Sequence, residues 1–112
     1  MQITYASKKV QHYFEDFEEM KKKIPQDWVR TVKKHLDRLR AAVVFGDFLR
    51  LNLGHPEQLK GKNAGKYSLH ITGNVRLIIE PSEKGEAVRI CEVVQIKGVA
   101  DYHGDKENWY IP

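Results

Sequence analysis

The chain has 112 residues, 41% of them hydrophobic and 10% aromatic, with a formal net charge of +4 at pH 7; these values predict one small globular domain over residues 1–112 with a basic surface suited to a polyanion. A single cysteine, Cys91, excludes an intrachain disulfide and a four-cysteine zinc site, which favours a reducing, cytoplasmic setting. The first residues lack a signal-peptide pattern and no apolar stretch approaches the roughly 20 residues of a membrane span, so secretion and membrane insertion are not expected.

Two amphipathic helices are predicted after a short strand at residues 2–6. Ser7 is placed to cap the first helix, whose apolar side chains recur at spacings of three and four. Pro25 fits the first turn of a second helix, which is expected to stop at Gly46. Helices joined so tightly are expected to form an antiparallel hairpin. The apolar positions of the two helices are Val10, Tyr13, Phe14, Phe17, Met20, Trp28, Val29, Val32, Leu36, Leu39 and Val43.

The second half of the chain reads as strands after a long connection. Residues 47–66 lack a clear period, and a connection of this length in a compact domain indicates a functional segment. Beyond it, alternating apolar and polar side chains predict strands at 67–72, 75–80 and 87–96, while 105–108 reads as a polar tail. The order of elements predicts an α+β fold: an N-terminal strand, the helical hairpin, and an antiparallel three-stranded meander packed on the helices.

The register of the central hairpin can be predicted from the sorting of its side chains. A two-residue loop would pair Ile71 with Arg76 and mix charge into the apolar face, whereas a three-residue loop pairs Thr72 with Arg76 and Ile71 with Leu77. The second register separates polar from apolar side chains and is therefore preferred. It places Ser68, His70, Thr72 and Arg76 on an open face, and Leu69, Ile71, Leu77 and Ile79 against the helices.

Positive charge is concentrated between residues 50 and 76. This segment contains five Lys and Arg residues and a single acidic residue, Glu57, so its formal net charge equals the +4 of the whole chain. The titratable sequence Asp101-Tyr102-His103 follows near the C-terminus. A cationic hairpin with a titratable group predicts a polyanion held beside an acid–base residue, and RNA is the first candidate. The cations of the segment are Arg50, Lys60, Lys62, Lys66 and Arg76.

Four short motifs carry a resemblance to a known family. They are Leu59-Lys60-Gly61, Gly65-Lys66-Tyr67-Ser68-Leu69, Gly73-Asn74-Val75-Arg76-Leu77 and Asp101-Tyr102-His103. In order and spacing the chain resembles the RelE/ParE toxin superfamily, and within it the HigB branch, also called plasmid-maintenance killer proteins. The resemblance spans nearly the whole chain in layout. It implies a RelE-like fold and the toxin of a type II toxin–antitoxin system, which enters the ribosomal A site and cuts messenger RNA there.

The resemblance also implies partners and site residues. A HigA-like helix-turn-helix antitoxin would neutralise the toxin in a heterotetrameric complex, the 70S ribosome would present the mRNA, and no cofactor is involved. Lys60, Arg76 and His103 match the positions that carry function in HigB-like proteins. The family pattern expects a second arginine four residues before Arg76, where this chain has Thr72. Lys62 or Lys66 could supply that missing phosphate contact.

The chemistry expected of these residues is metal-free cleavage of RNA by its own 2′-hydroxyl group. His103 is predicted to transfer the proton, with Asp101 orienting it. Arg76 and Lys60 are predicted to stabilise the charge that develops around phosphorus. The remaining RNA contacts are expected from Lys62, Lys66, Tyr67, His70, Asp101 and Tyr102, with either tyrosine as the base-stacking residue.

Each assignment has a structural alternative. His103 and Arg76 could be ordinary solvated residues, and His70 could be polar lining rather than a proton carrier. The other histidines are too scattered along the sequence to predict a metal site. Two further functions stay open: inhibition of DNA gyrase, as in ParE-like members of the same fold, and nucleic-acid binding without catalysis.

Overall fold

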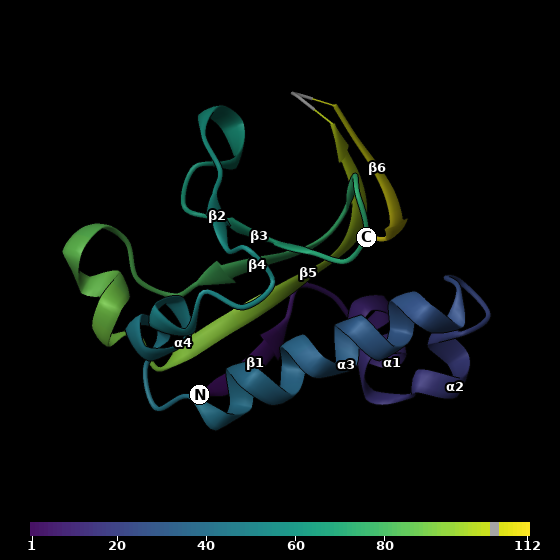
Figure 1. Cartoon of the computed structure of the whole chain (residues 1–112), viewed down its shortest axis with the longest axis horizontal. Coiled ribbons are helices and arrows are strands. Elements are labelled where there is room, and N and C mark those ends of the chain that lie inside the picture. Colours follow the sequence, from purple (N-terminus) through teal and green to yellow (C-terminus); the bar gives the residue numbers. More distant parts are fainter. Residues whose placement is uncertain (104–105) are drawn as a thin grey trace.

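A mixed sheet runs through the centre of the protein, and helices α1, α2 and α3 cover one of its faces (Figure 1). The computed structural model describes residues 1–103 and 106–112, and within them the sheet has six strands. The strands are β1 (Gln2–Tyr5), β2 (Glu57–Gln58), β3 (Tyr67–His70), β4 (Val75–Pro81), β5 (Val93–His103) and β6 (Lys106–Ile111). The helices are α1 (Lys8–Glu15), α2 (Phe17–Met20), α3 (Gln26–Ala41) and α4 (Phe45–Leu51), with 3₁₀ turns η1 (Gly61–Asn63) and η2 (Gly85–Ile90).

The long strand β5 organises the sheet, whose order is β1-β5-β4-β3-β2 with β6 also paired to β5. The first part of β5 pairs in parallel with β1, with Gln2 opposite Val93. Its last part pairs with β6 in the antiparallel sense, with Tyr102 opposite Glu107. The predicted α+β class is confirmed, but the sheet has more strands than the predicted three-stranded meander. Strand β1 joins the sheet, and β2 and β6 extend it.

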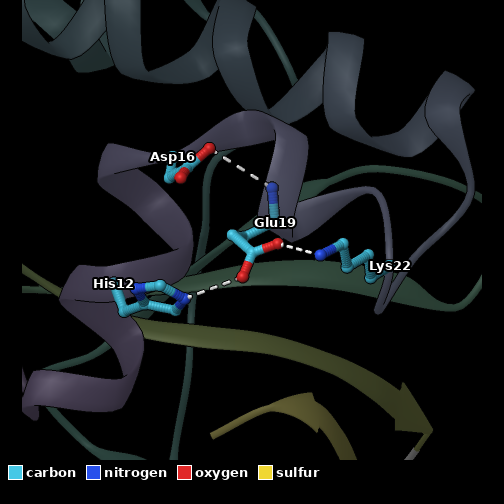
Figure 2. Close-up of polar contacts among 4 residues, drawn as sticks. All are labelled: His12, Asp16, Glu19 and Lys22. Carbon is cyan, nitrogen blue, oxygen red and sulfur yellow. Dashed lines mark hydrogen bonds and ion pairs between the residues drawn. The ribbon is translucent and has the colours of Figure 1, made fainter.

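The first helical segment is two helices rather than the single helix that the sequence predicted. Ser7 caps α1 as expected, its Oγ accepting a hydrogen bond from a first-turn amide at 3.1 Å. Asp16 then ends α1 and caps α2 by accepting from the amide of Glu19 at 3.3 Å. Figure 2 shows Glu19 at this joint between His12 and Lys22. Its carboxylate oxygens lie 3.5 Å from Nε2 of His12 and 2.5 Å from Nζ of Lys22. The apolar stripe continues across the break, so periodicity alone could not reveal it.

The second helix begins after Pro25 as predicted, but it ends at Ala41 instead of Gly46. Gly46 lies inside α4, where a Cβ atom would come 2.7 Å from the carbonyl oxygen of Arg89. The glycine is therefore needed for the close approach of α4 to η2, and it does not stop a helix. Val43 was predicted to belong to the apolar stripe, yet it lies beyond α3 and is 73% exposed.

Three further stretches differ from their predictions. Residues 47–66 were expected to be an irregular connection, but they contain most of α4 together with β2 and η1. The strand predicted at 87–96 begins as η2, and Ile90, one of its apolar positions, is 72% exposed. The polar tail predicted at 105–108 largely belongs to β6; Asp105 lies outside the described residues.

The central hairpin has the predicted faces but not the predicted register. Leu69 pairs with Leu77, and Arg76 pairs with His70 instead of Thr72. The register differs from the prediction by two residues, and because side chains alternate along a strand, such a shift keeps each one on its predicted face. Leu69 and Leu77 therefore face the helices, while His70 and Arg76 lie on the other side of the sheet.

Most of the core lies between the helices and the sheet. Cys91 is buried there as well, at 1% exposure. A smaller apolar cluster of Leu59, Ile78 and Ala100 lies on the face away from the helices. Among the described residues, no helix is long and apolar enough to cross a membrane. The largest side chains of the main core are those of Phe14, Met20, Leu36, Leu39, Phe45, Phe48, Leu69, Leu77, Ile79, Ile96 and Ile111.

A buried histidine makes the stability of the fold depend on pH. His35 is 1% exposed and donates from Nε2 to the carbonyl oxygen of His70 at 2.7 Å; among the described residues its Nδ1 has no hydrogen-bond partner. Burial is the main cause that lowers the pKa of His35 below its ordinary value of 6.5. The unfolded chain binds this proton near pH 6.5, whereas the folded protein takes it up only at lower pH. Stability therefore decreases as the pH falls below about 6.5.

We expect the free energy of unfolding in urea to fall from pH 7 to pH 5, with His35 contributing up to about 1.4 kcal/mol per pH unit. His35→Gln keeps a donor near the Nε2 position but cannot titrate, so its unfolding free energy should depend less on pH. His103→Gln, the same substitution at an exposed position, serves as the control and should leave the unfolding free energy at pH 7 within about 0.5 kcal/mol of that of the unchanged protein. Identical pH profiles for the unchanged protein and His35→Gln would contradict this account.

Candidate functional site

The candidate site lies on the sheet face away from the helices, which we call the open face. A row of directly paired residues crosses it from β3 to β6: His70, Arg76, Ala100 and Trp109. The segment that leads into η1 lies on the same side, because Leu59 belongs to the smaller apolar cluster together with Ala100. In Figure 1, the teal coil of η1 lies on the opposite side of the sheet from α1 to α3. The fold thus brings the predicted basic loop to the predicted open face.

A hollow of about 280 Å³ lies between η1 and β5. Its lining residues are Lys60, Gly61, Lys62, Asn63 and Tyr102. The η1 wall is tied to β6, because Nδ2 of Asn63 donates to the Glu107 carboxylate at 3.4 Å and Nζ of Lys62 lies 3.9 Å from the same carboxylate. Two ammonium groups and a phenol ring around this hollow can hold a phosphate and a base.

The Arg76 side chain is oriented by its own turn. Its Nη1 donates to the carbonyl oxygen of Thr72 at 2.6 Å and to that of Val75 at 3.1 Å. Among the described residues these bonds engage only Nη1, so Nε and Nη2 are available to a ligand. A half-buried guanidinium held in this way presents a planar fork, which matches the oxygens of a phosphate.

His70 lies directly opposite Arg76 and is half-buried. Its ring centroid is 5.0 Å from that of His55. Burial, followed by the nearby charges of Arg76 and His55, lowers the pKa of His70, while Glu57 acts in the opposite direction. The imidazole is therefore neutral at pH 7, and a neutral imidazole beside a bound phosphate can accept a proton from a hydroxyl group.

His103 and Asp101 lie on the other side of β5. Ala100 and Tyr102 face the open side, and side chains alternate along a strand, so Asp101 and His103 point away from it. His103 is also exposed at the end of β5. The structure therefore brings Lys60, Lys62 and Tyr102 together but does not place His103 with them. The catalytic role of His103 and the orienting role of Asp101 stay predictions.

Tyr67 faces the helices rather than the open face. Its ring meets that of Phe45 edge-on with centroids 5.0 Å apart, and burial raises the pKa of its hydroxyl group. It lines a larger hollow of about 720 Å³ beside α4 and η2, whose acidic and basic residues balance in number. Lys66 donates to Oδ1 of Asn63 at 3.1 Å and so supports η1. The larger hollow has no excess of positive charge to attract a polyanion. The smaller hollow is therefore the better candidate for a phosphate site. The charged residues of the larger hollow are Glu83, Lys84, Glu86 and Arg89.

Sequence reasoning missed Trp109, His55 and Asn63 as parts of this face. The consecutive residues Trp109, Tyr110 and Ile111 are of types enriched in strands, and they could have indicated strand β6. His55 and Asn63 lie in segments without periodicity, where only the folded chain reveals their neighbours. Within residues 1–103 and 106–112, no group of three or more His, Cys, Asp and Glu side chains is placed to hold a metal ion.

Comparison with known proteins shows similarity in fold only. No protein-family model and no curated protein sequence matches the chain. The YoeB–YefM complex from Staphylococcus aureus aligns over 92% of this chain and 97% of the matched chain, with a TM-score of 0.59 and 18% identity. The YoeB/ParE toxin from Agrobacterium tumefaciens aligns over 92% and 99%, with a TM-score of 0.52 and 20% identity. The chain therefore has a fold similar to that of these toxins.

Proposed function

We propose that the chain is the toxin of a type II toxin–antitoxin system, a HigB-like endoribonuclease that cleaves messenger RNA in the ribosomal A site. One observation carries the proposal: the open face combines a hollow lined by Lys60, Lys62 and Tyr102 with an oriented Arg76 opposite His70. Cations can stabilise the charge around phosphorus, an imidazole can transfer protons, and an aromatic ring can stack on a base. The fold shared with solved YoeB and YoeB/ParE structures supports a toxin.

In this mechanism the RNA supplies its own nucleophile. The 2′-oxygen bonds to the adjacent phosphorus as the bond to the 5′-oxygen breaks, which leaves a 2′,3′-cyclic phosphate and a 5′-hydroxyl end. A base removes the 2′-hydroxyl proton and an acid protonates the departing 5′-oxygen. Arg76 and Lys60 would hold the charge that grows on the phosphoryl oxygens, and Lys62 would stand in for the arginine replaced by Thr72.

Two histidines are candidates for the proton transfer. His103 is the residue that the HigB resemblance indicates, and His70 is the one that the register places opposite Arg76. The lowered pKa of His70 favours the neutral form that a general base needs at pH 7. Asp101 would orient the imidazole of His103. The backbone of His70 is held in place because its carbonyl oxygen accepts a hydrogen bond from Nε2 of the buried His35 at 2.7 Å.

Mapping of new mRNA 5′ ends in bacteria that express the chain tests the proposal. We expect in-frame cuts in translated messages, and a loss of about 100- to 10,000-fold when the proton-transferring histidine becomes alanine. Comparison of His70→Ala with His103→Ala assigns the role, and His12→Ala on α1 is the control that should cut normally. Growth arrest with intact messages would exclude mRNA cleavage as the function.

The proposal includes partners. A HigA-like helix-turn-helix antitoxin would bind the toxin in a heterotetramer, and the 70S ribosome in the cytoplasm would position the mRNA substrate. One similar structure is a YoeB–YefM complex, which supports an antitoxin partner of some kind. Positioning by the ribosome would supply much of the rate, because correct orientation of a nucleophile lowers the barrier substantially.

A ParE-like inhibitor of DNA gyrase is the second candidate function. The position of His103 away from the open face is compatible with a function that needs no cleavage. Among such functions, the fold similarity to the YoeB/ParE toxin favours gyrase inhibition over the third candidate, a nucleic-acid-binding module without catalysis. Gyrase inhibition would leave messages intact and persist in His70→Ala and His103→Ala. A simple binding module would retain RNA without cutting it.

A further inference from the structure

The C-terminal strand adds a tryptophan to the open face that the proposed cleavage mechanism does not use. Trp109 in β6 lies directly opposite Ala100, which in turn pairs with Arg76. The indole is half-buried and packs, together with Tyr102, against the smaller apolar cluster. Aromatic surface therefore extends along the open face from the hollow beside η1 to the edge of the sheet.

Two small residues of β5 form the floor beneath this indole. Ala100 is fully buried in the apolar cluster. A Cβ atom built on Gly98 would come 3.2 Å from Cζ3 of Trp109, so the indole lies close over the glycine. One part of the ring thus rests on the sheet, and its exposed part belongs to the same face as Arg76.

The neighbouring aromatic residue has a different role. The ring of Tyr110 packs edge-on against Trp28 of α3, with centroids 5.3 Å apart. Tyr110 therefore belongs to the helix side of the sheet, while Trp109 belongs to the open face. This contrast provides a matched pair of adjacent aromatic residues, of which only one lies beside the cationic groups.

We propose that Trp109 stacks on an unpaired base of single-stranded RNA whose phosphate is bound by Arg76. Only β5 separates β4 from β6, so the Cα atoms of Arg76 and Trp109 lie about 10 Å apart. A phosphate at the guanidinium and a base at the indole can belong to one nucleotide or to adjoining nucleotides. Stacking on an aromatic ring needs a base that is not already stacked in a duplex. The identity of the ligand as RNA rests on the proposed function.

The test uses a fluorescein-labelled hexanucleotide of 2′-O-methyl RNA, which lacks the hydroxyl group needed for cleavage. In low salt, Trp109→Leu should weaken binding about 5- to 150-fold, the range expected for loss of one stacked base. Tyr110→Leu should bind within about twofold of the unchanged protein. Trp109→Phe keeps a smaller ring and should bind with intermediate affinity. Circular dichroism confirms that each variant is folded.

A second measurement needs no substitution at position 109. The chain contains two tryptophans, so Trp28→Phe leaves Trp109 as the sole indole emitter. The hexanucleotide should quench this emission, whereas inorganic tripolyphosphate, which has charge but no base, should not. Equal affinity of Trp109→Leu and the unchanged protein, or no quenching by the hexanucleotide, would overturn the stacking role.

Failure of this inference can be separated from failure of the proposed function. Cleavage of ribosome-bound mRNA by the unchanged protein, combined with unaltered oligonucleotide binding by Trp109→Leu, overturns the stacking role and leaves the ribonuclease proposal intact. Binding that depends on Trp109 in a protein that never cuts mRNA supports the stacking role and overturns the ribonuclease proposal.

Discussion

Arg76→Ala is expected to slow mRNA cleavage on programmed ribosomes by about 100- to 1000-fold, the usual cost of removing one preorganised donor from a developing negative charge. The guanidinium is already oriented by the carbonyl oxygens of Thr72 and Val75, so little reorganisation is needed when a phosphate binds. Single-turnover cleavage, measured at saturating toxin, would report this loss. Arg76→Lys restores the charge without the planar fork and should recover only part of the rate.

Arg89→Ala is the matched control for this experiment. Arg89 is an exposed arginine that belongs to η2 and lines the larger hollow, away from the open face. Its removal lowers the net charge by the same amount and should leave the cleavage rate within about twofold. Equal losses in Arg76→Ala and Arg89→Ala would show that overall charge, rather than a phosphate site on the open face, controls activity.

Gly98→Ala is expected to lower the free energy of unfolding by about 3 kcal/mol or more, the sum of backbone strain and steric overlap. Gly98 has a φ of +142°, and an added Cβ would overlap the carbonyl oxygen of Ile111. The methyl group can fit only if β6 moves away from β5. Urea unfolding followed by circular dichroism measures the effect.

The control for this substitution is Gly73→Ala in the β3–β4 turn. Gly73 is exposed, its φ is not positive, and none of the described residues comes within 4 Å of a Cβ built there. Its replacement should change stability by no more than about 1 kcal/mol, and could increase it by restricting the unfolded chain. Similar unfolding midpoints for Gly98→Ala and Gly73→Ala would disprove the close approach of β6 to Gly98.

The elements with strong local signals could be predicted from the sequence. The cap at Ser7, the start of a helix after Pro25 and the faces of the central hairpin are all present in the structure. Gly46 was misinterpreted because its role is tertiary: it permits η2 to approach α4, and nothing in the local sequence distinguishes this from a helix stop. The hairpin register could not be fixed by hydrophobic sorting, since a shift of two residues gives the same faces.

The basic part of the candidate site could be predicted from the sequence, but the position of its histidine could not. Lys60 and Lys62 were expected at a phosphate site, and the structure places both around one hollow with Tyr102. The position of His103 depends on a strand that continues through residues 101–103, where alternation separates it from Tyr102. The sequence predicted that strand to end at residue 96, so this alternation could not be anticipated. The pairing of His70 with Arg76 was not predicted either, because the predicted register placed Thr72 opposite Arg76.

The parallel pairing of β1 with β5 also constrains how the chain can fold during synthesis. Gln2 leaves the ribosome well before its partner strand, which starts at Val93 and is itself paired with β6. Contacts this distant in sequence close late and slow folding. The nascent polypeptide therefore cannot assemble its sheet until β5 and β6 have left the ribosome, and a product truncated before β5 would lack the open face.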